Sequence, residues 1–219
     1  MIDFLFLDTE ESSHFPAESR EAIKEVANAT EPEIRALLPG LPDVIELVSQ
    51  TGDSDMVIPE IGAEAWASTR QRVTWMVDPS RLGGVPAVAR TQLRHGLFHE
   101  FHHLVRGWVV FPRVYPERFI HGVIPEGLAT AFERDFSGST PPYGQYGEEV
   151  EEWVQELLDL PPAAHHDHWM FEHPDGRKHV GYRAGTFIVD KAMAASGRSS
   201  ADLVLTSADE ILTLAGYGN

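Results

Sequence analysis

The order of apolar and polar positions divides the chain into an early part that contains strands and a later part dominated by helices. Apolar residues alternate with polar ones over 43–50 and 70–78, which predicts two strands, and 51–55 has the composition of a turn. The stretch 58–68 is ambiguous and is compatible with a further short strand. The pattern therefore places the sheet before most of the helices.

Helical signals lie on both sides of these strands. Pro16 suits the first turn of a helix over 17–29, and Thr30 is expected to cap a second short helix over 31–38, with Glu33 at the capping-box position. Pro86 opens a long helix that reaches residue 108. Further helices are predicted at 125–136, 148–160, 184–196 and 208–216, with a long loop or hairpin at 161–180.

The order of elements predicts the fold class. Strands first and helices later are typical of an α+β protein, here with a small, mostly antiparallel sheet packed on a helical body. The length of 219 residues suits a single domain over 1–219.

Composition excludes several classes of function. The formal net charge of −17 repels phosphate backbones, so we expect no nucleic-acid partner. We find neither a long apolar run nor a secretory signal, and we therefore expect no membrane association and a cytoplasmic location. The chain has no cysteine, so any metal ligands have to be histidine, aspartate or glutamate.

One helix has the spacing of a metal site. His99, Glu100 and His103 form the pattern H-E-x-x-H within the long helix that opens at Pro86. Positions four apart lie one turn apart on the same face, so both imidazoles reach one ion. Glu100 is offset round the helix and can reach a water on the metal without binding the metal. This arrangement suits hydrolytic zinc, Zn2+.

A third ligand is expected from Glu126, because a catalytic zinc usually takes three protein ligands and leaves one position open. Pro125 is expected to mark the start of its helix, and Gly127 leaves room beside the carboxylate. Thr130 and Glu133 follow on the same helix. Glu133 either orients a ligand histidine or bonds locally.

Three segments carry a resemblance to known proteins. They read "HEFHHLVR", "EGLATAFE" and "GYRAGTFIV". Together they resemble the motifs of a family of predicted zinc-dependent proteases known mainly by a domain-of-unknown-function label, and more broadly the gluzincin metallopeptidases. The resemblance implies a zincin-like fold, with His99, His103 and Glu126 as zinc ligands and Glu100 as general base. We find no clear G-A-M-E-N-like segment, so recognition of a substrate N-terminus, as in the related aminopeptidases, is not supported.

The remaining candidate residues have weaker signals. Tyr182 is flanked by glycines and is a candidate donor to the oxyanion, with a packed core tyrosine as the alternative. His179 and His121 are lesser candidates. His102 is expected to be a surface residue or to lie behind the ligands, and Arg106 either pairs with a carboxylate or lies in solvent.

Two functions remain open at this point. The first is a zinc metallopeptidase that acts on a peptide or protein substrate. The alternative is a non-proteolytic metal-binding or regulatory protein on the same scaffold, but an intact Glu100 favours the enzyme. The histidines 165, 166 and 168 form a possible rival metal site, although a solvated loop is the simpler interpretation.

Overall fold

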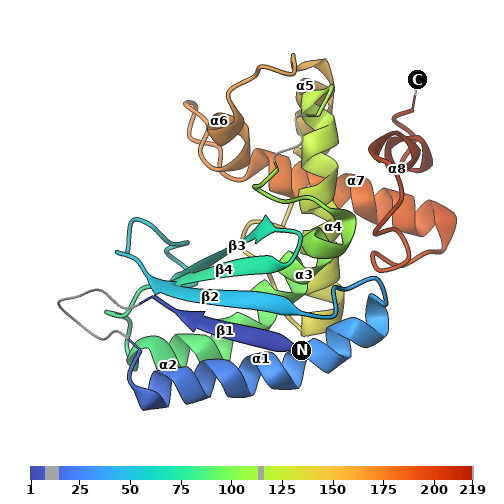
Figure 1. Cartoon of the computed structure of the whole chain (residues 1–219). Coiled ribbons are helices and arrows are strands. Elements are labelled where there is room, and N and C mark those ends of the chain that lie inside the picture. Colours follow the sequence, from blue (N-terminus) through green and yellow to red (C-terminus); the bar gives the residue numbers. More distant parts are fainter. Residues whose placement is uncertain (8–14, 113–115, 219) are drawn as a thin grey trace. The chain divides into compact units, whose positions relative to one another are not determined.

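The computed structural model describes residues 1–7, 15–112 and 116–218 (Figure 1). The chain divides into two compact units. These are Met1–Arg113 and Val114–Asn219, referred to as unit 1 and unit 2. The α+β class is confirmed, whereas the single domain over 1–219 stays a prediction. Among the described residues, no helix is both long and apolar enough to cross a membrane.

Unit 1 contains a four-stranded sheet in the order β1-β2-β4-β3. Its strands are β1 (Ile2–Phe6), β2 (Ile45–Thr51), β3 (Ala63–Thr69) and β4 (Arg72–Val77). The pairs β1–β2 and β2–β4 are parallel, and only β3–β4 is antiparallel. The prediction of a mostly antiparallel sheet is therefore wrong. A strand that the pattern did not reveal, β1, pairs in parallel with β2. The ambiguous stretch 58–68 does contain a strand, β3, at an edge of the sheet.

The helices of unit 1 differ from the predicted helices at α1 and agree with the prediction for the long helix that contains the H-E-x-x-H pattern. A single helix, α1 (Ala17–Leu37), replaces the two predicted ones. Thr30 is not a cap, because its hydroxyl donates to the Val26 carbonyl at 2.7 Å inside the helix. The predicted long helix is present as α2 (Gly84–Val88), a π-helical turn η1 (Ala89–Leu93) and α3 (Arg94–Arg106).

One face of the sheet supports the helices α1 and α3. Phe4, Leu47 and Val73 share this face through the strand register, and Lys24 of α1 lies over the Phe4 ring. Gly96 of α3 approaches Ala65 of β3, where an added Cβ would lie 3.7 Å from the alanine Cβ. Apolar residues of α3 are buried, as its sequence predicts: Leu97, Phe98, Phe101 and Leu104.

Unit 2 is helical. It comprises α4 (Phe119–Ser137), α5 (Val150–Asp159), α6 (His166–Met170), α7 (Val180–Ser196) and α8 (Ala208–Leu214). Pro125 does not mark the start of α4, since it lies inside the helix. The segment predicted as a loop contains α6 and a bridge between Glu172 and Lys178, so it has hairpin character.

Two glycines bring the backbones of α4 and α7 into direct contact. A Cβ added to Gly127 would lie 2.7 Å from the Gly185 Cα, and one added to Gly185 would lie 2.7 Å from the Val123 carbonyl oxygen. Real Cβ atoms do not approach other atoms so closely, so neither position accepts a side chain without displacing a helix. The crossing sets Gly127, the residue that follows Glu126, against Gly185, three residues after Tyr182.

Candidate metal centre

The two histidines of the H-E-x-x-H pattern lie side by side on α3. Their ring centroids are 4.8 Å apart, and His99 and His103 are only 6% and 4% exposed. Helical spacing explains the alignment, because residues four apart project from one face. Burial of two imidazoles requires polar partners, and a metal ion is one such partner.

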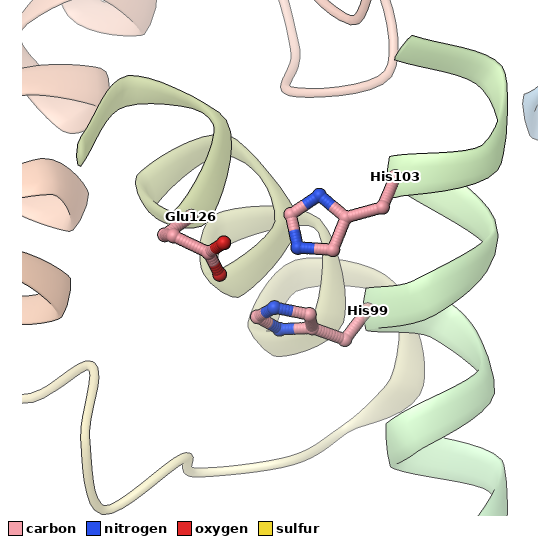
Figure 2. A group of neighbouring side chains, drawn as sticks. All are labelled: His99, His103 and Glu126. Carbon is pink, nitrogen blue, oxygen red and sulfur yellow. The ribbon is translucent and has the colours of Figure 1, made fainter. Parts of the chain in front are cut away.

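Glu126 of α4 supplies a third donor. One ligand atom from each of His99, His103 and Glu126 lies within 4.8 Å of the others, and Figure 2 shows the two imidazoles and the carboxylate directed toward one another. Zinc bonds to nitrogen and oxygen are about 2.0–2.2 Å long, and the three donors are close enough together that they could hold one ion. The donor set of two imidazoles and one carboxylate fits zinc.

Glu100 lies in the same turn of α3 and is 5% exposed. A second carboxylate in unit 1, which the sequence did not single out, lies within its electrostatic reach. Burial, and then the negative charge of Glu100, raise the pKa of the half-buried Glu64 on the edge strand β3. Two carboxylates in mutual reach favour a positive charge nearby. Nothing in the ambiguous 58–68 stretch indicated this pairing.

For two further residues of α3, the structure decides between the positions that the sequence left open. His102 is fully buried, which excludes the surface alternative and leaves the position behind the ligands. Its place among buried neighbours follows from a helix that is covered on most sides. Arg106 is half-buried rather than fully solvated, and burial lowers its pKa to about 10. The histidine at position 95 is outside the three-residue metal group found in the described chain.

Glu133 bonds locally within unit 2. Its carboxylate, 2% exposed, accepts hydrogen bonds from the Ser139 hydroxyl at 2.8 Å and the Tyr143 hydroxyl at 2.5 Å. Thr130, one turn after Glu126, is buried, and its hydroxyl has no partner among the described residues. Tyr143 has no sequence signal that marks it, because it lies in an irregular loop.

Tyr182 lies in the first turn of α7 beside two aromatic residues. Its ring centroid is 5.2 Å from that of Tyr143 and 6.3 Å from that of His179. His179 is the described non-glycine residue with positive φ, at 56°, a conformation that costs free energy and is often found at functional sites. His121, by contrast, bonds to Asp209 at 3.1 Å.

The rival histidine segment does not form a metal group. His165, His166 and His168 are exposed, and in the part of the chain that the structure describes, the group able to hold a metal is formed by His99, His103 and Glu126 instead.

One family model matches the chain. The model of the family described as Predicted Zn-dependent protease (DUF2268) matches residues 43–213, well over half of the chain. No curated protein and no solved structure matches the chain. The matched region contains α3, α4 and α7, and with them all three segments that carry the candidate site. The chain therefore belongs to this family of predicted zinc-dependent proteases.

Proposed function

We propose that the protein is a zinc-dependent metallopeptidase that hydrolyses peptide bonds with Glu100 as general base. The observation that carries the proposal is the group of donor atoms from His99, His103 and Glu126, all within 4.8 Å of one another. Three protein ligands of this kind leave one coordination position open, which is the arrangement of catalytic rather than structural zinc sites.

Zinc is the metal that the donor set favours. Cysteine is absent from the chain, so the ligands are nitrogen and oxygen atoms. Calcium and magnesium prefer sites made entirely of oxygen atoms, whereas two imidazoles and one carboxylate are common around catalytic zinc. The family description names the same metal.

Each protein group has a distinct task. Zinc held by His99, His103 and Glu126 would polarise the scissile carbonyl and lower the pKa of a water molecule. Glu100 takes a proton from the attacking water and then delivers it to the leaving nitrogen. Tyr182 donates a hydrogen bond to the oxygen on which negative charge develops. We assign this role to its hydroxyl because Tyr182 lies three residues before Gly185, which meets Gly127, the residue that follows Glu126.

Glu100→Gln tests the proposal. The amide is nearly isosteric with the carboxylate but does not accept a proton at neutral pH, and position 100 is not a ligand. We expect normal zinc content and a loss of hydrolysis of about 10²- to 10⁴-fold, the usual contribution of general-base catalysis. The assay is digestion of a broad peptide library, with elemental analysis of zinc in every sample.

Tyr182→Phe serves as the graded comparison. Loss of one oxyanion donor costs on the order of 10²- to 10³-fold, so this variant should retain more activity than Glu100→Gln. A zinc-loaded Glu100→Gln protein with full activity would overturn the mechanism. A zinc-loaded wild type that cleaves no peptide would favour the non-proteolytic metal-binding protein instead.

A further inference from the structure

Arg183, in the first turn of α7, has a guanidinium group without a protein partner in the described residues. Its Nε is fully buried and has no hydrogen-bond acceptor, and the described chain offers it no ion pair. The side chain as a whole is half-buried, so a ligand can still reach it. Burial of a donor that loses its water and gains no acceptor costs free energy. Buried donors without an acceptor are therefore rare in folded proteins, and a ligand is one possible acceptor.

The lack of a partner sets Arg183 apart from several other arginines of the described chain. The chain carries 34 acidic residues against 17 basic ones, and three other partly buried arginines are paired with carboxylates. Arg35 bonds to Glu31, Arg134 to Asp190, and Arg177 to Glu156. With acidic groups in twofold excess, an unpaired guanidinium is not a consequence of composition.

The nearest acid on the same face of α7 is already occupied. Asp190 lies two turns after Arg183, which places both on one side of the helix. Its carboxylate accepts bonds from Arg134 at 2.8 and 2.9 Å and from the Tyr146 hydroxyl at 2.7 Å. The Asp190 carboxylate is therefore already bonded to Arg134 of α4 and to Tyr146 of the loop after it. Among the described residues, no carboxylate accepts from the Arg183 guanidinium.

The surroundings of Arg183 belong to the candidate site. It follows Tyr182 directly and lies one turn after His179. The loop after α4 covers this side of the helix, since Tyr143 contacts Tyr182 and Tyr146 contacts Phe187, with ring centroids 5.2 and 5.3 Å apart. Two residues after Arg183, α7 crosses α4 at Gly185, which meets Gly127, the residue that follows Glu126.

We propose that Arg183 binds a carboxylate group of the peptide substrate. A guanidinium presents parallel N–H donors that match the two oxygens of a carboxylate, and charge-assisted bonds of this kind are about twice as strong as neutral ones. The carboxylate belongs either to the C-terminus of the peptide or to an acidic side chain. This inference rests on the proposed peptidase function, because it names the substrate class of that site.

The test measures binding and not turnover. The protein is the zinc-loaded Glu100→Gln variant, which leaves the peptides intact. The probes are three acetylated pentapeptides with otherwise neutral side chains: one with a free C-terminal carboxylate, one amidated, and one amidated with a single internal glutamate. Calorimetry gives the dissociation constant of each. Arg183→Gln is the test variant, and Arg90→Gln, which removes an exposed arginine of η1, is the matched control.

At least one carboxylate peptide should bind about tenfold more tightly than the neutral amide, as expected for a hydrogen bond to a charged group. The peptide that binds more tightly than the neutral amide identifies whether the carboxylate is a C-terminus or an acidic side chain. Arg183→Gln should abolish this preference, and Arg90→Gln should retain it. Equal binding of all three peptides, or a preference that survives Arg183→Gln, would overturn the assignment. If Arg183→Gln fails to fold, as judged by thermal melting, Arg183→Met replaces it because it keeps the buried stem.

The result separates this inference from the proposed function. A preference that depends on Arg183, together with a zinc-loaded wild type that cleaves no peptide, refutes the hydrolysis and leaves the carboxylate site standing. Cleavage of free and amidated peptides with equal kcat/KM, together with equal binding, refutes the carboxylate site and leaves the hydrolysis standing.

Discussion

Two short segments of this chain are rich in histidine, but they differ in every physical property that matters for metal binding. Residues 99–103 of α3 contain three histidines, and residues 165–168 at α6 also contain three. The first set is buried and the second is exposed. The number of histidines is therefore equal in the two segments, whereas only the first contributes to a three-donor group in the described chain.

The difference lies in what surrounds the imidazoles. In α3, helical spacing aligns His99 with His103, and Glu126 completes the group. At α6, His165 and His168 stack on each other with ring centroids 3.9 Å apart, and His166 lies 3.2 Å from the adjacent Asp167. The exposed histidines find partners among themselves and their sequence neighbours. A metal site requires a donor brought from elsewhere in the chain, and not only several histidines together.

Removal of one histidine from each segment gives the largest expected contrast. His103→Ala should lose most of the zinc that the wild type holds, about one ion per chain, and with it nearly all hydrolysis, because two ligands remain. His168→Ala should keep both the zinc content and the hydrolytic activity of the wild type. Elemental analysis after dialysis against a weak chelator measures the zinc. Equal zinc content in wild type and His103→Ala would transfer the site to the α6 segment.

Hydrogen exchange should sharpen the same contrast. Amides of residues 95–106 lie in a helix with many buried apolar neighbours, whereas 161–180 contains several exposed side chains and short elements. We expect exchange in 161–180 to be faster by at least about tenfold. Mass spectrometry of peptic fragments measures both regions in one experiment. Equal protection would show that the α6 segment is packed as firmly as the metal helix.

The smallest expected effect concerns the hairpin between Glu172 and Lys178. The Arg177 amide, followed by the His173 and Arg177 side chains, lowers the pKa of Asp175 to about 2. A lowered carboxyl pKa stabilises the hairpin above the ordinary value of 3.8, and this contribution is lost as the pH falls toward 2. His173 is thus used locally, which further separates this segment from the metal helix.

Asp175→Asn provides the measurement for this hairpin. At pH 6 it should speed exchange of the Arg177 amide by a few-fold, because that amide donates to the Asp175 carboxylate at 3.0 Å. In the parent protein, the same change should begin only below pH 4. An Arg177 amide that exchanges at the same rate in both proteins at pH 6 would show that the hairpin does not depend on Asp175.

Some features could be predicted from the sequence because they depend on local spacing. The burial of α3 and the alignment of its histidines follow from helical periodicity, and β2 and β4 follow from alternation. The parallel pairing of β1 with β2 depends on a partner some forty residues away, which no local pattern reveals. Tyr143 was missed for the same reason, since its bond to Glu133 depends on the path of an irregular loop.

Local residue preferences also gave wrong predictions of helix starts and caps. Proline predicts a helix start, but Pro32 and Pro125 both lie inside helices. Each lacks an N–H donor, so one intrahelical bond is lost, and the packing of the surrounding helix compensates. Thr30 is a good cap in isolation, but it bonds inside α1 instead. In each case tertiary packing outweighed a local preference of about 1–3 kcal/mol.

The contact between Gly127 and Gly185 has a mechanical consequence. Side chains usually form a deformable layer between packed helices, because rotamers adjust when a neighbour moves. At this crossing backbone meets backbone, so that layer is absent. A displacement of α4 at this crossing therefore moves the Gly185 backbone of α7 directly instead of being absorbed by side chains. In the proposed enzyme, we expect ligation by Glu126 to affect the orientation of Tyr182, three residues before Gly185, through this rigid junction.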